Sequence, residues 1–111
     1  MIAFDMNHEI LATFLAEEGT EPKTVCKMTA NGTVGPCADG DSFCGVVNTV
    51  RGGCAGVVLH GVVTAAYSGT TPAVGKTALV ADGSGGVKAG EGESCLVLDV
   101  DETEKTVKLF L

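Results

Sequence analysis

The sequence predicts an all-β fold, a small antiparallel β-barrel or sandwich of about seven or eight short strands. Two features of the composition favour this class. Glycine occurs 16 times in 111 residues, and Gly and Val dominate the middle of the chain, where a helical protein would be rich in Leu, Glu and Lys. A hydrophobic share of 45% with 19% charged residues is typical of a folded globular chain, and the length predicts one domain.

The N-terminal segment allows two interpretations. A helix capped by Asn7 and ended by Gly19 would place four apolar side chains on one face: Ile10, Leu11, Phe14 and Leu15. The alternation of Ile10, Ala12 and Phe14 instead indicates a strand. The pattern by itself favours the helix.

Turn signals divide the central part of the chain into strands. Asn31-Gly32 tolerates positive φ at both positions and predicts a two-residue hairpin. A turn at 38–41 precedes a strand over 42–50, and the Arg-Gly-Gly turn at 51–53 leads into a long apolar run over 54–66. Gly56 and Gly61 interrupt that run and predict bulges or bends, where a sheet curls toward closure.

The C-terminal part is predicted to contain a loop over 67–75, a short strand over 76–81 and a turn over 82–86. Two alternating strands complete the fold, joined by an acidic loop over 101–104. Each strand is predicted to place three apolar residues on one face: Leu96, Leu98 and Val100 in the first, and Val107, Leu109 and Leu111 in the second.

Charge and hydropathy exclude some classes of partner. The net charge is -7, and the seven Lys and Arg residues are scattered, so no basic patch for nucleic acid is expected. No apolar run reaches the length of a membrane span, and the first residues lack the basic region of a signal peptide. We therefore expect no membrane association and a chain that stays in the compartment where it is made.

The cysteines predict buried, reduced thiols. There are five, Cys26, Cys37, Cys44, Cys54 and Cys95, and an odd number argues against a closed disulfide framework. Their spacing matches no common zinc arrangement. Cys44, Cys54 and Cys95 lie in apolar runs, where a cysteine usually serves as a small hydrophobic residue.

The stretch GTTPAVGKTALV, residues 69–80, partly matches a phosphate-binding loop. Five residues separate Gly69 from Gly75 where the motif has four, and Pro72 removes an N–H donor. The glycine cluster after Ala81 leaves no room for the helix that would face the phosphate. We expect a surface loop and a short strand here, with no nucleotide site.

No catalytic or metal-binding constellation is evident. The two histidines, His8 and His60, have no partner at a ligand or triad spacing, and no nucleophile elbow occurs. Carboxylates cluster at turns, most densely over 99–104, but that run lacks the Gly and final Glu of a calcium loop. We expect a solvated hairpin tip, and neither catalysis nor a cofactor.

The order of the segments over 24–111 resembles one protein family. The segments are VCKMTANGTV, GDSFCGVV, the Val-rich strand ending in GVV, YSG, LVADGSGGV and the terminal VKLFL. Together they resemble the small head-decoration (capsid cement) proteins of tailed bacteriophages and prophages, a family formerly described as a domain of unknown function. The resemblance covers about four-fifths of the chain.

The resemblance implies a non-catalytic virion protein that binds and stabilises the lattice of major capsid protein, often as a homo-trimer. It would be made in the bacterial cytoplasm and end on the capsid surface. It also implies an extended N-terminal arm or strand over 1–22, followed by a barrel-like domain over 23–111. Two roles stay open for Ile2, Phe4 and Met6: they are candidate docking residues of the arm, since an arm that orders on contact adds pairing at a sheet edge, or they complete the core.

Two other functions stay open from the sequence. One is a small β-barrel enzyme or ligand-binding module with His60 and a carboxylate near one mouth. The other is an intracellular regulatory partner protein. A deep pocket lined by His60 and acids would favour the first of these alternatives.

Overall fold

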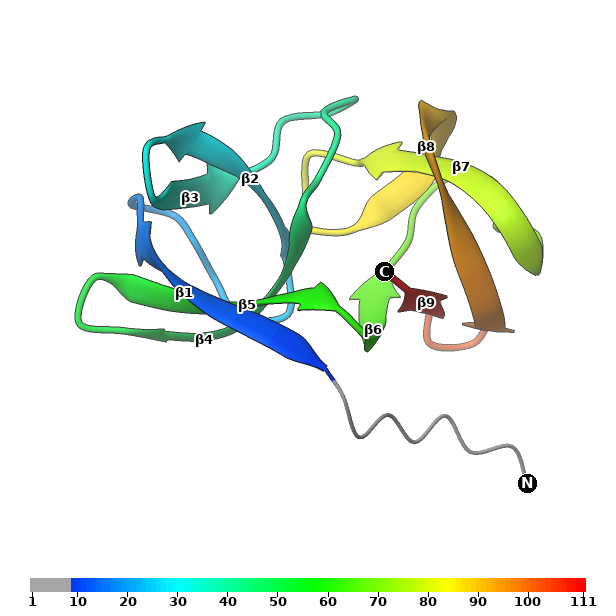
Figure 1. The fold of residues 1–111 in the computed structure, drawn as a ribbon. Coiled ribbons are helices and arrows are strands. Elements are labelled where there is room, and N and C mark those ends of the chain that lie inside the picture. The colour runs from blue at the N-terminus through cyan, green and yellow to red at the C-terminus, as the bar shows by residue number, and fades with distance from the viewer. Residues whose placement is uncertain (1–8) are drawn as a thin grey trace.

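The computed structural model describes residues 9–111 and confirms the all-β class, with no helix in this range (Figure 1). It contains nine strands, slightly more than predicted: β1 Ile10–Ala16, β2 Val25–Ala30, β3 Thr33–Pro36, β4 Gly45–Arg51, β5 Cys54–His60, β6 Val62–Ala66, β7 Gly75–Ala81, β8 Val87–Asp101 and β9 Thr106–Phe110. The first five close into a barrel in the order β1-β3-β2-β4-β5, and the last four form a sheet in the order β6-β9-β8-β7.

The N-terminal segment is a strand, so the helix favoured by the pattern is wrong. β1 runs parallel to β3 and antiparallel to β5, and its pairing on both sides closes the barrel. Phe14 and Ala16 pack inside the barrel, while Leu11 and Leu15 on the opposite face are exposed. Pairing with two distant strands outweighs the local capping signal. The predicted docking residues Ile2, Phe4 and Met6 lie outside the described residues.

The Asn31-Gly32 hairpin between β2 and β3 is confirmed, but its turn differs from the expected one. Gly32 has a φ of 64°, whereas the positive-φ residues other than glycine in the described chain are Lys23 and Lys105. The pairing also shifts between Met28 and Ala30. A local bulge at the end of β2 and a single left-handed glycine therefore close this hairpin.

The predicted interruption at Gly61 is the point where the chain leaves the barrel and enters the second sheet (Figure 1). Gly61 has a φ of 138°, a conformation that side chains disfavour. Its backbone exchanges hydrogen bonds with Leu111, which tie the joint to the end of β9. Gly56 pairs with Thr13 and Thr49 inside the barrel, and the register of β4 against β5 shifts beside it, between Val47 and Thr49, so the bulge predicted there is confirmed.

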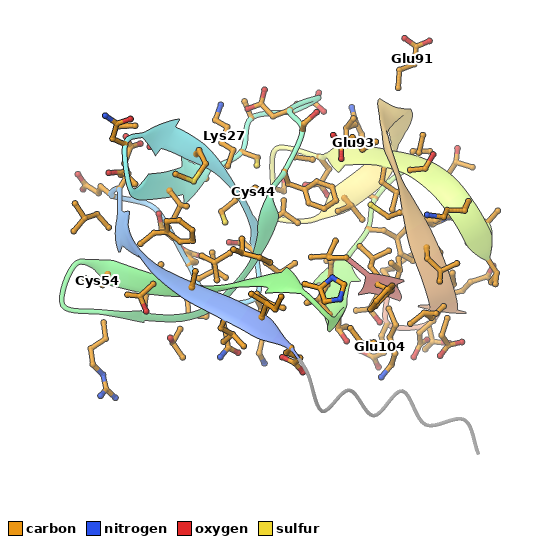
Figure 2. All side chains as sticks on the ribbon, viewed as in Figure 1. Lys27, Cys44, Cys54, Glu91, Glu93 and Glu104 are labelled. Carbon is orange, nitrogen blue, oxygen red and sulfur yellow. The ribbon has the colours of Figure 1, made fainter. Side chains whose placement is uncertain are left out.

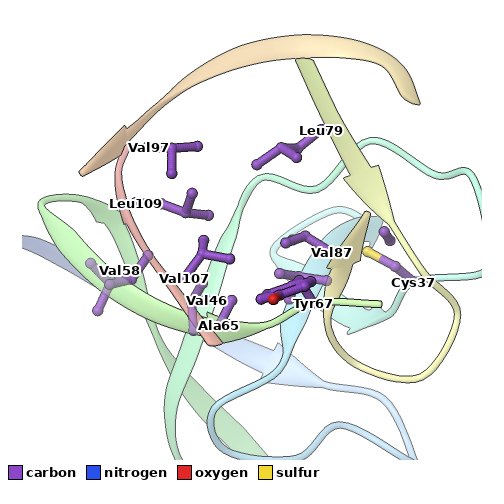
Figure 3. Close-up of a cluster of buried hydrophobic side chains, with 13 residues drawn as sticks. Cys37, Val46, Val58, Ala65, Tyr67, Leu79, Val87, Val97, Val107 and Leu109 are labelled. Atoms are coloured by element: carbon purple, nitrogen blue, oxygen red, sulfur yellow. The ribbon is translucent and has the colours of Figure 1, made fainter. Parts of the chain in front are cut away.

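Two hydrophobic cores hold the fold together. The barrel interior is small and is filled by short side chains: Cys26, Val34, Val47, Ala55 and Val57. A larger core lies between the outer surface of the barrel and the second sheet (Figure 3). There Val46 and Val58 of the barrel belong to one cluster with Leu79, Val97 and Leu109 of the sheet. The second sheet thus buries its inner face against the outside of the barrel.

β8 differs most from its prediction. It begins at Val87 and not at Ser94, and residues 90–93 have no partners on β7, because Leu79 pairs with Ala89 and Ala78 with Ser94. A second register shift lies between Val97 and Asp99. The predicted face of Leu96, Leu98 and Val100 is therefore wrong: the core side carries Cys95, Val97 and Val100. A period of two fails across a bulge, because the extra residue moves the following side chains to the other face. The predicted face of β9 is confirmed, with Val107, Leu109 and Leu111 at the core.

Candidate functional site

A cleft of about 650 Å³ lies where the barrel meets the second sheet. Its walls come from the segment before β4, the end of β5, and β7, β8 and β9. The titratable and nucleophilic residues that line it are Ser42, Cys44, His60, Lys76, Glu93, Ser94 and Cys95. Figure 2 labels two of them, Cys44 and Glu93. Reactive side chains from four separate segments therefore share one concave surface, beside apolar side chains such as Phe43 and Phe110.

His60 forms one rim of the cleft at the end of β5. Its ring meets Phe110 of β9 edge to face, with 5.1 Å between ring centroids and 66° between planes. This contact holds the imidazole against the second sheet while the residue stays exposed. The sequence placed His60 in a strand without a partner, and the structure adds an aromatic neighbour together with Glu93 and Lys76 in the same cleft.

Cys44 is the most perturbed group of the cleft. The neighbouring Cys26 thiol lowers the pKa of Cys44 to about 7, against the opposing effect of burial. The backbone N–H groups of Cys44 and Met28 assist. The same contact, with burial, raises the pKa of Cys26. The Cys44 sulfur thus carries a substantial thiolate fraction at neutral pH.

The cysteines are free, but their burial differs from the prediction. Cys26 and Cys37 are buried as expected, whereas Cys44 is exposed and Cys54 and Cys95 are half-buried. Burial raises the pKa of Cys37 to about 11 and also raises that of Cys95. The expectation of five buried thiols is therefore wrong for the cysteine with the lowered pKa, because an apolar neighbourhood in sequence does not determine which side of a strand end faces solvent.

Two ion pairs hold the loop before Cys44 in place. Asp41 accepts a hydrogen bond from Lys27 of β2 at 2.5 Å and one from the Ala38 N–H at 2.9 Å. The contact with Lys27, followed by the Ala38 N–H, lowers the pKa of Asp41. A second ion pair joins Asp39 of the same loop to Lys88 of β8. The turn predicted at 38–41 is confirmed, with the Asp41 N–H donating to the Ala38 carbonyl at 3.1 Å.

A second candidate surface is the β1 outer face, which we define as Leu11 and Leu15. These side chains are 47% and 58% exposed, and they are four residues apart on one face of the strand. Ile10, at the start of the same strand, is 55% exposed. Apolar side chains that gather on one face, beyond what a core needs, are typical of a surface that meets another protein.

The other sequence motifs have structural roles. Gly75, Lys76 and Thr77 begin β7, so the predicted loop and short strand are confirmed. Asp101 accepts hydrogen bonds from the N–H groups of Thr103 and Glu104 at 3.0 and 3.1 Å, which shapes the predicted hairpin tip. Within residues 9–111 no group of three or more His, Cys, Asp or Glu side chains is placed to hold a metal ion. The same range contains no helix long and apolar enough to cross a membrane.

Comparison with known proteins adds no relative. The chain matches no protein-family model and no curated protein. The functional argument therefore depends on the sequence pattern and on the geometry described above.

Proposed function

We propose that this protein is a non-catalytic head-decoration protein that binds, as a trimer, to the outer surface of an assembled capsid of a tailed phage or prophage. The observation that carries the proposal is the β1 outer face: Leu11 and Leu15 face water on a rigid, closed barrel. This face follows directly in sequence after the proposed docking residues Ile2, Phe4 and Met6. An exposed apolar strip on the barrel provides a surface against which a capsid subunit packs.

The composition of the rest of the protein supports this role. A lattice-binding protein needs a body that keeps its shape and stays soluble before assembly. A closed five-stranded barrel with a sheet packed on it provides the first property, and a net charge of -7 provides the second. Many copies with a small contribution each then stabilise the capsid lattice.

The test is co-sedimentation with expanded heads from the prophage that encodes the protein. We expect the wild-type protein to bind and to raise the resistance of heads to heat, and Leu11→Ser/Leu15→Ser to bind at least about tenfold more weakly, since each leucine contributes about 1.5–3 kcal/mol when buried. Val74→Ser is the matched control, because Val74 is 70% exposed and lies before β7, away from β1. Light scattering of the free protein tests the trimer.

Failure of the wild-type protein to bind its own heads would refute the proposal. If the double variant binds as tightly as the Val74 control, the proposal loses the β1 outer face as its contact. Circular dichroism of each variant shows whether it is folded, so that weaker binding caused by misfolding is recognised.

The cleft favours a second candidate function, a small-molecule binding module. Its volume of about 650 Å³ lies in the range of ligand pockets, and His60, Lys76 and Glu93 provide polar groups on an apolar wall. A thermal-shift screen of small anions, amines and aromatic acids tests it. A ligand whose effect disappears in both His60→Ala and Lys76→Ala would support the module, and no stabilisation by any compound would argue against it.

A further inference from the structure

Cys26 and Cys44 form a contacting thiol pair where β2 meets β4. Cys26 is in register with Gly45, yet the Cys44 N–H donates to the Cys26 carbonyl at 2.8 Å. Two consecutive residues therefore lie opposite Cys26, as in a β-bulge, which brings the Cys44 side chain beside that of Cys26. The Cys26 S–H donates to the Gly45 carbonyl oxygen, with 3.7 Å between sulfur and oxygen.

Gly45 makes this approach possible. A Cβ atom at this position would lie 2.5 Å from the Val58 carbonyl oxygen and 2.7 Å from a Val57 methyl group. The backbone next to Cys44 therefore packs directly on β5, and its position is fixed by the barrel. Backbone contacts on both strands therefore fix the positions of the two cysteines relative to each other.

The two thiols differ in access and in protonation. Cys44 is exposed and lines the cleft, whereas Cys26 is fully buried in the barrel core. The neighbouring Cys26 thiol lowers the pKa of Cys44, and burial and the same neighbour raise that of Cys26, so Cys44 is the better nucleophile and Cys26 keeps its proton. Other titratable groups surround the pair: Cys37 after β3, Lys27 on β2, Asp41 in the following loop, and His60, Lys76, Glu93 and Cys95 across the cleft.

We propose that Cys44 is a peroxide-reactive thiol and that Cys26 converts its oxidised form into a Cys26–Cys44 disulfide. The Cys44 thiolate attacks one oxygen of hydrogen peroxide, the O–O bond breaks, and Cys44 sulfenic acid and hydroxide form. The Cys26 sulfur then attacks the Cys44 sulfur and forms the S–S bond. The sulfenic OH leaves as water with the proton of Cys26. Two thiols lose two electrons in total, and one peroxide is reduced to two waters after hydroxide takes up a proton.

This inference is independent of capsid binding. It assigns a modification site to a strand junction that the proposed docking surface does not include. It also distinguishes Cys44 from Cys95, which lines the same cleft but is half-buried and has a raised pKa. Cys95→Ser is thus the matched control for Cys44→Ser.

The experiment treats the reduced full-length protein with stoichiometric hydrogen peroxide, alkylates the remaining thiols and maps the products by mass spectrometry. We expect a mass loss of two hydrogens, three alkylated thiols out of five and a link between Cys26 and Cys44. Cleavage must occur at both Lys and Asp. Cys37 and Cys44 lie in the same tryptic fragment, 28–51. Cleavage at Asp39 or Asp41 separates the two cysteines into different peptides.

The variants separate the two steps. Cys44→Ser should abolish the link, and Cys95→Ser should leave it unchanged. Cys26→Ser should let the Cys44 sulfenic acid persist, so that it is trapped by a 1,3-diketone reagent. In the wild-type protein, the rate of Cys44 alkylation should rise through a pH of about 7, well below the ordinary thiol value of 9.0.

Several results would overturn the proposal. These are a Cys37–Cys44 link, first oxidation at Cys54 or Cys95, or a Cys44 that stays fully alkylatable after peroxide treatment. If Cys26→Ser fails to fold, the map and the pH profile of the wild-type protein decide the question by themselves, because neither measurement requires a substitution.

Discussion

The barrel and the second sheet bury their apolar side chains in different ways. Each strand of the barrel pairs on both sides, and its interior is filled by short side chains such as Ala55 and Val57. The four-stranded sheet ends in β6 and β7, and its inner face, with Leu79 and Leu109, is buried in one cluster with barrel residues and the segments beside them. The barrel thus supplies much of its own core, whereas the sheet depends on the barrel for its apolar partner surface.

Paired substitutions in the two cores should give the largest effect. Leu109→Ala should lower the free energy of unfolding by about 2–5 kcal/mol, since Leu109 is fully buried and its removal leaves a cavity between the sheet and the barrel. Val57→Ala in the barrel interior should cost less, about 2 kcal/mol, because fewer side-chain carbon atoms are lost than in Leu109→Ala. Urea unfolding measures both, and a larger cost at Val57 would contradict the comparison.

The second largest loss of stability is expected when a side chain is added at a glycine whose backbone lies against a neighbouring strand. Gly45→Ala places a Cβ atom 2.5 Å from the Val58 carbonyl oxygen, and Gly92→Ala places one 2.4 Å from the Leu79 carbonyl oxygen. Each clash should cost about 1–3 kcal/mol. The cost should be greater at Gly45, because strands on both sides hold β4, whereas Gly92 lies in the bulge of β8. Thermal unfolding compares the two variants, and a larger loss at Gly92 would show that the bulge is as rigid as the barrel.

The smallest effect should come from the half-buried pair of Asp41 and Lys27. The hydrogen bond from Lys27 holds the pKa of Asp41 below its ordinary value of 3.8. The pair therefore stabilises the folded state at pH above 3.8, and this contribution is lost as the pH falls through the folded pKa. Asp41→Asn should flatten the acid limb of stability against pH, with Glu102→Gln as an exposed control. An unchanged acid limb would show that the contact is too screened to contribute.

Local turn chemistry made much of the fold predictable. Glycine-containing turns at Asn31-Gly32, 38–41, 51–53 and 82–86 identified most strand boundaries. The alternation of Val107, Leu109 and Leu111 identified the buried face of β9. These features depend on a few neighbouring residues, so a sequence pattern contains them.

Features set by distant contacts were not predictable. β1 is a strand because β3 and β5 pair with it, although its own spacing suits a helix. The core face of β8 follows from a bulge opposite β9, which no local alternation indicates. The cleft joins Cys44, His60 and Cys95, which are separated in sequence and come together only when the sheet packs on the barrel. The contact between Cys26 and Cys44 depends in the same way on the pairing of β2 with β4.

Closure of the barrel also determines where the free protein is prone to aggregate. Within residues 9–111, β6 pairs with β9 alone, so one row of its backbone N–H and C=O groups has no strand beside it. The strand, VVTAA, contains neither a charged residue nor a proline, the two features that usually protect a sheet edge. β6 is therefore the sheet edge at which we expect a second copy of the chain to pair in concentrated solution.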